Sequence, residues 1–423
     1  MDRRALANDT RSPKHPAGSV PVSVPRGGTR LAVAIIFTTI LIDFLGYSIL
    51  IPVLPTFAKE NLGVDAFGIG LITSFYALGL VLFLPLWGWV SDRIGRRPVI
   101  LVSLLGTALS FVLLAVAHSL GAALFARFLG GFFGASIGTA QAAMTDLTDE
   151  SSRAQGMGVI GAASGIGVVL GTALGGLLGG IDPLLPFYAT AGVAALNFLL
   201  AAFALPESKP PITREHSWSS FAHAVVPEPL QAVASARTKK QRFYLFLFLQ
   251  IFFAFSAIES MFPLFAAARF GWGETQTGLF MAAIALVLGG SQGLIVGPLS
   301  RRWSENGLTG FGLGLTGASI AGLSLCHSLP ALTFCSLGVA LGAGIAFPAF
   351  TSLFSKVCGA HEAGAAMSRS QAMIHLGRAL GAFCWGWVFS SAGAGPPFFF
   401  AGLALLVTLG VFVGAGRVLL PQS

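Results

Sequence analysis

The stretch "GWVSDRIGRRPVI", residues 88–100, gathers charge in a chain that carries little of it. Only 10% of all residues are charged, yet four charged side chains fall within six positions here: Asp92, Arg93, Arg96 and Arg97. Strongly apolar sequence lies on both sides. Gly88 allows close approach at a helix end, and Gly95 permits a tight turn. The stretch is therefore predicted to be a short charged loop between two apolar segments.

The apolar sequence extends over the whole chain of 423 residues, of which 54% are hydrophobic. A soluble protein has about 25% charged residues. The apolar runs here reach the roughly 20 residues that a helix needs to cross a bilayer, and a helix satisfies its own backbone hydrogen bonds in lipid. We therefore predict an all-α membrane protein with twelve transmembrane helices. The predicted spans are 31–55, 67–90, 98–117, 121–143, 155–179, 185–205, 243–267, 275–298, 307–327, 330–354, 365–391 and 396–418.

Lys and Arg are unevenly distributed between the two sides that these spans define. With the N-terminus in the cytoplasm, 21 of the 25 lie in the leader, the even-numbered loops and the C-terminal tail. Only Lys59 and Arg269 lie on the other side, and Arg127 and Arg378 lie within helices. An excess of basic residues marks cytoplasmic loops. Both termini are therefore predicted to be cytoplasmic, and the net charge of +8 reflects topology and not a nucleic-acid partner.

The chain also repeats itself on either side of its long polar stretch, 206–241. "GWVSDRIGR" from Gly88 matches "GPLSRRWSE" from Gly297, and "GASIGTAQAAMTD" from Gly134 matches "GAGIAFPAFTSLF" from Gly342 at nearly the same offset. These matches predict two pseudo-symmetric six-helix halves, an organisation suited to a transporter that rocks around a central site. The predicted parts are a disordered cytoplasmic tail 1–30, an N-terminal half 31–205, a cytoplasmic linker 206–241, a C-terminal half 242–418 and a cytoplasmic tail 419–423.

The charged loop resembles the signature loop of the major facilitator superfamily, in the pattern Gly88-x-x-x-Asp92-Arg93-x-Gly95-Arg96-Arg97. The resemblance covers nearly the whole chain, including the linker that begins at "LPES", residues 205–208. In that family the loop is a cytoplasmic latch that stabilises the outward-facing state. The resemblance implies this role for the six residues of the pattern. Because Arg96 and Arg97 are adjacent, we expect Arg97 to substitute in part for Arg96.

Three further segments resemble the drug/proton antiporters of this superfamily, including tetracycline exporters. They are "LIDFLGYSILIPVLPTFA" in the first span, "ARFLGGFFGAS" with Arg127 at the charged position, and "MTDLTDESSRAQGMGVIGAASGIGVVLGTALGGLLGG". In the last of these, Gly167, Gly171 and Gly175 recur every four residues and share one helix face. Small residues at this spacing let membrane helices pack closely, so we expect these glycines to form a packing face.

Four ionisable side chains lie inside predicted spans: Asp43, Arg127, Glu259 and Arg378. Such a group costs roughly 2.5–3.5 kcal/mol on insertion scales and marks a functional site, unless it belongs to a structural ion pair. The resemblance places the spans of Asp43 and Glu259 at a central cavity, and Tyr47 shares the helix face of Asp43. We expect one carboxylate to bind substrate or proton and the other to be its counterpart, with Arg127 pairing with a carboxylate in one state only.

His375 lies on the same side of its predicted span as Arg378. A histidine ordinarily titrates near neutral pH. It is therefore a candidate proton relay, and a hydrogen-bonded core histidine is the alternative.

Enzyme and metal chemistry are not expected. "GASIG", residues 134–138, matches the GxSxG pattern, but a nucleophile elbow needs a strand-to-helix turn. No GxxxxGK[ST] loop for ATP phosphates occurs. The four cysteines have no CxxC spacing, so neither a metal site nor a disulfide framework is predicted. We expect no cofactor.

The predicted function is proton-coupled efflux of small lipophilic or cationic compounds by alternating access. The expected partners are a small-molecule substrate, protons and membrane lipid, with no nucleic acid, and the expected form is a monomer in a bacterial inner membrane. An importer or uniporter of a small metabolite is the first alternative. A membrane scaffold or receptor that transports nothing is the second.

Overall fold

The structure is a computed structural model that describes residues 26–135, 137–146, 153–208, 228–236, 238–359 and 363–419. All regular elements within these ranges are helices. Most of the predicted tail 1–30 lies outside the described residues, as do the middle of the predicted linker 206–241 and the end of the tail 419–423. Ser136, the serine of the GxSxG match, also lies outside them.

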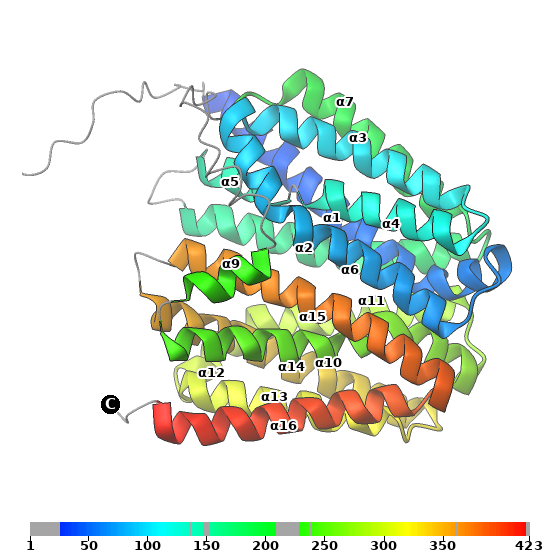
Figure 1. Ribbon diagram of the computed structural model, residues 1–423, viewed down its shortest axis with the longest axis vertical. Coiled ribbons are helices and arrows are strands. Elements are labelled where there is room, and N and C mark those ends of the chain that lie inside the picture. Colours follow the sequence, from blue (N-terminus) through cyan, green and yellow to red (C-terminus); the bar gives the residue numbers. More distant parts are fainter. Residues whose placement is uncertain are drawn as a thin grey trace, which may run out of the picture.

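The helices form two groups that follow the order of the chain (Figure 1). The first bundle lies in the upper part of the figure and contains α1 (Arg26–Asn61), α2 (Ala66–Ile94), α3 (Arg96–Ala115), α4 (Leu120–Gly134), α5 (Ile137–Asp146), α6 (Arg153–Gly179) and α7 (Leu185–Ala204). The second bundle lies below it and contains α10 (Lys239–Phe270), α11 (Glu274–Gly290), the π-helical turn η1 (Ser291–Ile295), α12 (Val296–Ser300), α13 (Glu305–Leu323), α14 (Leu329–Cys358), α15 (Ala363–Ala392) and α16 (Pro396–Leu419). A short helix, α9 (Glu228–Ser235), precedes the second bundle.

Each of the twelve predicted spans overlaps a helix, and ten candidate membrane spans in the described residues have the length and hydropathy to cross a membrane. The predicted span 121–143 covers both α4 and α5, and 275–298 runs through α11, η1 and α12. The spans 307–327 and 365–391 coincide with helices α13 and α15, which are not among the ten. The protein is therefore an all-helical membrane protein.

Helix ends follow local signals in the sequence. The Asp65 side chain caps α2 by accepting a hydrogen bond from the backbone N–H of Gly68. Gly95, with φ of +100°, makes the turn between α2 and α3, in a conformation that favours glycine. Thr238 and Gln241 form a reciprocal capping box at the start of α10. These turns set the positions of the loop at 92–97 and of the long helix α10.

Helix α6 packs on α1 through the three glycines predicted to form a packing face. A Cβ atom added at Gly167 would lie 2.6 Å from the carbonyl oxygen of Leu41, and one at Gly171 would lie 2.6 Å from that of Leu45. A Cβ at Gly175 would lie 2.9 Å from the carbonyl carbon of Ile49. These positions leave no room for a side chain, so α1 and α6 touch backbone to backbone.

The two bundles meet closely at the end that carries the α1–α2 turn, which we call the 61–66 end. There α2 packs on α15: Ser390 Oγ donates to Asp65 Oδ2 at 2.7 Å, which lowers the pKa of Asp65, and Ser74 Oγ donates to the Ala379 carbonyl at 2.7 Å. Six hydrogen bonds between the bundles lie between the centre and this end. The 61–66 end is therefore closed.

Helix α6 packs on α11 at the same end. A Cβ at Gly278 would lie 2.6 Å from the Cα of Gly176, and Thr275 Oγ1 donates to the Gly176 carbonyl at 3.1 Å. Thr56 of α1 also bonds Glu274 of α11. Two helix pairs, α2 with α15 and α6 with α11, thus bring the bundles together at this end.

The first prediction concerns the α1–α6 contact. Gly171→Val should lower the free energy of unfolding by about 1–3 kcal/mol, because the added atoms overlap the α1 backbone. Thermal unfolding in detergent measures the effect. Gly165→Val is the matched control on the same helix, since a Cβ there meets nothing within 4 Å. Equal melting temperatures for the two variants would show that this contact is not tight.

Candidate functional site

A buried ion pair occupies the middle of the protein. Arg378 Nη2 of α15 lies 2.9 Å from Glu259 Oε1 of α10, and the two side chains are only 23% and 13% exposed. The Tyr47 hydroxyl of α1 donates to the other carboxylate oxygen, Oε2, at 3.2 Å. Glu259 is therefore held from both sides, once by an arginine of its own bundle and once by a tyrosine of the other bundle.

Asp43 and Arg127 lie next to this ion pair and line one small cavity with Tyr47 and Tyr76. The cavity measures about 10 Å³, the least volume that holds a water molecule. Asp43 Oδ2 and Arg127 Nε are buried and have no hydrogen-bond partner in the described residues. No ion pair joins the two side chains there. Asp43 is thus a carboxylate without an arginine partner, unlike Glu259.

Two tyrosines connect the arginines of the two bundles. The Arg127 guanidinium carbon lies 4.2 Å from the Tyr76 ring centroid, the Tyr76 and Tyr47 centroids are 5.8 Å apart, and the Arg378 guanidinium carbon lies 5.6 Å from the Tyr47 ring. Cations over aromatic faces within about 6 Å are attracted to the ring. The row Arg127–Tyr76–Tyr47–Arg378 therefore joins the unpaired arginine to the paired one.

The role of Tyr76 in this site was not predicted from the sequence, although the composition of the chain gave a signal. The chain has four tyrosines among 36 phenylalanines. A tyrosine inside an apolar helix carries a hydroxyl that needs a partner or a polar cavity. A search for tyrosines within the predicted spans finds all four, Tyr47, Tyr76, Tyr188 and Tyr244, and so does not single out Tyr76.

His375 lies on α15 one turn before Arg378 and is partly buried. No hydrogen bond joins its ring to the described residues, and both the proton relay and the core histidine stay predictions. Within the described residues, no group of three or more His, Cys, Asp and Glu side chains is arranged to hold a metal ion.

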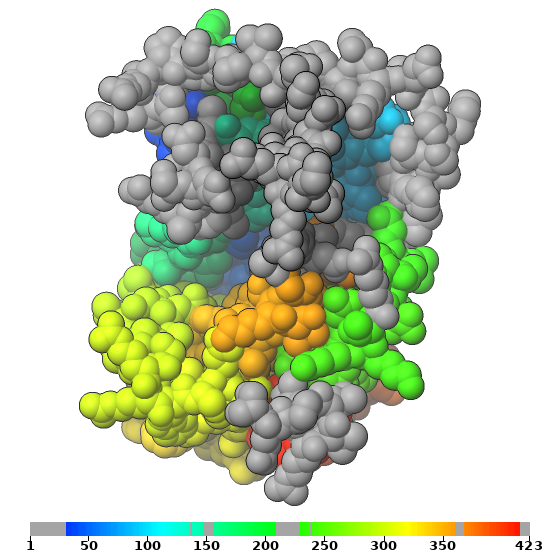
Figure 2. Space-filling model, turned by 90° about the vertical axis from the view of Figure 1, so that its left-hand side faces the viewer, coloured from blue at the N-terminus to red at the C-terminus, as the bar shows by residue number. Residues whose placement is uncertain are grey.

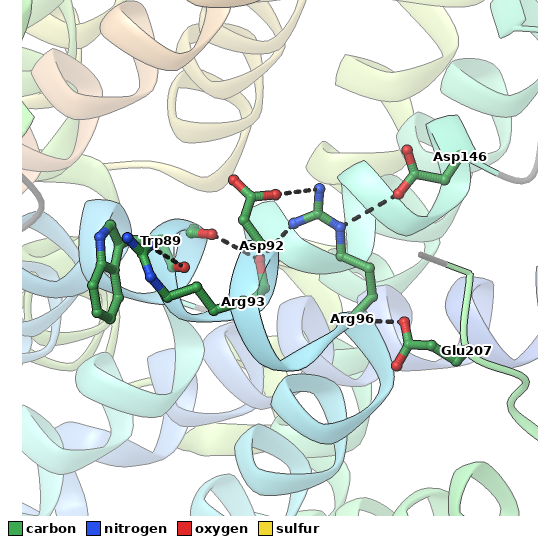
Figure 3. A network of polar contacts seen from close by, with 8 residues as sticks. Trp89, Asp92, Arg93, Arg96, Asp146 and Glu207 are labelled. Atoms are coloured by element: carbon green, nitrogen blue, oxygen red, sulfur yellow. Dashed lines mark hydrogen bonds and ion pairs between the residues drawn. The ribbon is translucent and has the colours of Figure 1, made fainter. Parts of the chain in front are cut away.

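The charged loop forms a second polar cluster, centred on Arg96 (Figure 3). The Arg96 guanidinium lies 3.0 Å from Asp92 Oδ1 and 3.4 Å from Asp146 Oδ2 of α5, and it donates to Ser91 Oγ at 2.5 Å. Only 8% of Arg96 is exposed. This side chain therefore ties the end of α2 to the end of α5.

Glu207 binds the other side of the same turn. Its carboxylate accepts the backbone N–H groups of Arg96 at 2.8 Å and of Arg97 at 3.1 Å, which are the first two of α3. A carboxylate at a helix N-terminus is favoured by the helix dipole. Glu207 thereby fixes the chain after α7 to the loop, a contact that the sequence alone did not indicate.

The remaining loop residues have separate roles in this conformation. The Arg93 guanidinium carbon lies 3.6 Å from the centre of the Trp89 ring. Arg97 Nη2 donates to the Ala202 carbonyl at 2.6 Å. The Arg96 and Arg97 side chains therefore bind different helices in this conformation, while the partial substitution of Arg97 for Arg96 stays a prediction. At Gly88 an added Cβ meets nothing within 4 Å, so the predicted close approach is absent there.

Comparison with known proteins gives one consistent result. The model of the Major Facilitator Superfamily matches residues 36–382. The chain is 31% identical over 345 residues to the class B tetracycline resistance protein of Escherichia coli, covering 79% of this chain and 82% of that protein. It is 26% identical to multidrug resistance protein 1 of Bacillus subtilis (strain 168), covering 90% and 96%. The crystal structure of the human organic anion transporter MFSD10 (TETRAN) superposes with a TM-score of 0.69 at 25% identity, covering 91% and 99%.

The second prediction separates the two buried carboxylates. Glu259→Gln should lower the free energy of unfolding by about 3–5 kcal/mol, because it leaves Arg378 buried without its ion-pair partner. Asp43→Asn should change stability little, since Asp43 Oδ2 has no hydrogen bond to lose. Thermal unfolding of both variants in the same detergent measures the difference. Similar losses for both would mean that Asp43 is also paired.

The third prediction concerns the loop. Arg96→Ala should lower the free energy of unfolding by at least about 2 kcal/mol, because it removes contacts to Asp92, Asp146 and Ser91. Arg97→Ala is the control and should have the smaller effect, as the Arg97 side chain has one hydrogen bond to the described residues, to Ala202. A larger loss of melting temperature in Arg96→Ala than in Arg97→Ala would show that Arg96 alone holds the cluster together. Equal losses would show that the two arginines are redundant.

Proposed function

The chain belongs to the Major Facilitator Superfamily, and from that premise we propose that it exports small lipophilic or cationic compounds in exchange for protons. The observation that carries the proposal is Asp43, a carboxylate in the membrane interior that no arginine neutralises. The relatives named for tetracycline and multidrug resistance support efflux as the direction. The substrate is a small molecule, and no ATP site is needed, because the proton gradient drives the exchange.

The proposed architecture is twelve membrane-spanning helices in two six-helix halves, 31–205 and 242–418. The linker 206–241 and the tails 1–30 and 419–423 lie in the cytoplasm in this proposal. The excess of Lys and Arg at the 92–97 end supports that orientation. The protein acts as a monomer within the lipid of a bacterial inner membrane. The closed 61–66 end then faces outward, so the conformation described here is closed to the outside.

In the proposed mechanism, Asp43 exchanges the proton and Glu259 keeps the bundles in register. A carboxylate in a small cavity is neutral when protonated and attracts a cation when ionised. A cationic substrate therefore competes with the proton for Asp43, and this competition at one site couples the two fluxes. Arg127 lies on the same cavity and becomes the partner of ionised Asp43 in another conformation. His375 serves as a relay through the second bundle.

The tyrosine row provides the link between this exchange and the movement of the bundles. Tyr47 lies one helical turn from Asp43 and bonds Glu259 of the other bundle. Binding at Asp43 that shifts the Tyr47 ring also changes the hydrogen bond across the bundles. The six loop residues Gly88, Asp92, Arg93, Gly95, Arg96 and Arg97 act as a latch at the cytoplasmic end. Gly167, Gly171 and Gly175 let α1 and α6 move as one unit.

The fourth prediction tests the proton site. In proteoliposomes with an imposed pH gradient, wild-type protein should accumulate the lipophilic cation ethidium and release protons when ethidium is added. Asp43→Asn should reduce both signals to the level of empty liposomes, because the amide takes up no proton. Glu60→Gln is the control, an exposed carboxylate on the same helix. Full gradient-driven accumulation by Asp43→Asn would overturn the assignment.

A further inference from the structure

Helix α9 (Glu228–Ser235) has one apolar side that is packed and another that is not. Ala232 and, just after the helix, Ala236 are 1% exposed and pack in a cluster with residues of α10 and α15. Leu230 and Val233 are three positions apart and remain 64% and 46% exposed. A residue pair at this spacing shares one helix face. The unpacked face of α9 is therefore apolar.

Cations follow α9 closely in the sequence. Lys239 and Lys240 are the first two residues of α10, and Arg242 follows. The N-terminus of a helix carries partial positive charge and favours acidic side chains, yet the first turn of α10 has none. Neither lysine makes a hydrogen bond or ion pair with the described residues. Both lysines belong to the excess of basic residues on the predicted cytoplasmic side, and without a partner in the described residues they are free to bind an anion from outside the chain.

The place of the cations in the fold identifies the kind of partner. The candidate membrane span Lys239–Phe270 begins at these residues. The start of a membrane-spanning helix lies at the level of the lipid headgroups. An apolar face flanked by lysines at that level is the pattern of a helix that lies in the membrane interface, where anionic lipids attract basic side chains.

We propose that Leu230 and Val233 insert at the membrane interface while Lys239 and Lys240 bind the phosphates of anionic phospholipids. We call these four residues the α9 surface. Helix α9 and the start of α10 lie at the left-hand end of the protein in Figure 1, and Figure 2 looks at that end, where their green atoms lie beside the orange atoms of α15. The partner is the membrane itself.

Lipid at the α9 surface acts on both bundles. Helix α9 contacts α2 of the first bundle and α15 of the second, and these two helices also form one of the closed pairs at the 61–66 end. Holding α9 in the interface restrains the other ends of the same two helices. Anionic lipid should therefore stabilise the conformation described here over one in which α2 and α15 separate at the 61–66 end.

The fifth prediction is read by hydrogen exchange of the full chain in lipid nanodiscs, which does not depend on transport. Amides of residues 230–236 should exchange more slowly in phosphatidylcholine with phosphatidylglycerol than in phosphatidylcholine alone. Lys239→Gln with Lys240→Gln should remove this difference, since each basic side chain near an anionic surface contributes about fivefold and two contribute about thirtyfold. Leu230→Ser with Val233→Ser should raise exchange in both lipids.

Arg301→Gln with Arg302→Gln is the matched control, because it removes two exposed cations from the turn between α12 and α13. This variant should keep the difference between the two lipids. The proposal fails if wild-type protein exchanges equally in both lipids. It also fails if the Arg301/Arg302 variant loses the difference between the lipids as the Lys239/Lys240 variant does. It also fails if inorganic phosphate added to phosphatidylcholine nanodiscs reproduces the protection, which would indicate a soluble anion site. Loss of transport with lipid-dependent protection intact would overturn only the proposed function.

Discussion

The ion pair between Glu259 and Arg378 is the interaction on which the centre of the protein depends. Neither charge is tolerated alone among apolar helices, and removing one partner of such a pair costs about 3–5 kcal/mol. The pair fixes α10 against α15. Through the Tyr47 hydroxyl, it also determines which part of α1 faces the second bundle. Because Arg378 forms its ion pair with Glu259 and not with Asp43, the remaining carboxylate keeps its affinity for a proton or a cation.

This arrangement explains why the packing between bundles is made of small residues. A charge in the membrane interior changes its partner only if the helices that carry it can move. Gly176 against Gly278 lets α6 and α11 meet by their backbones. Gly70 of α2 likewise meets Gly386 of α15, with a Cβ at Gly70 3.1 Å from the Gly386 Cα. Backbone surfaces without interlocking side chains can part and meet again without repacking a core. The tight α1–α6 contact, by comparison, lies within one bundle.

The sequence was sufficient to predict the helices. It was insufficient to predict which side chains pair across them. The apolar runs predicted a helix in every place where the structure has a long one, because a backbone in lipid has no other way to satisfy its hydrogen bonds. Asp43 and Glu259 were equivalent in the sequence, each a carboxylate in the first helix of its half. Their difference depends on Arg378, which lies 119 residues after Glu259 and reaches it only through the packing of α10 on α15. The same holds for Arg96, whose partner Asp146 lies 50 residues away.

The two bundles differ at the end that carries the charged loop, although the sequence suggested a repeat. In the first bundle, Arg96 is buried and joins α2 to α5, while Glu207 caps α3. In the second bundle, the turn after α12 has Arg301 where the repeat places Asp92, and its ion pair is Lys356 with Glu305, in which the lysine side chain is 67% exposed. An exposed pair contributes about 0–1 kcal/mol. At this end the first bundle is therefore held by a buried arginine, whereas the ion pair of Lys356 with Glu305 in the second bundle is largely exposed on its lysine side.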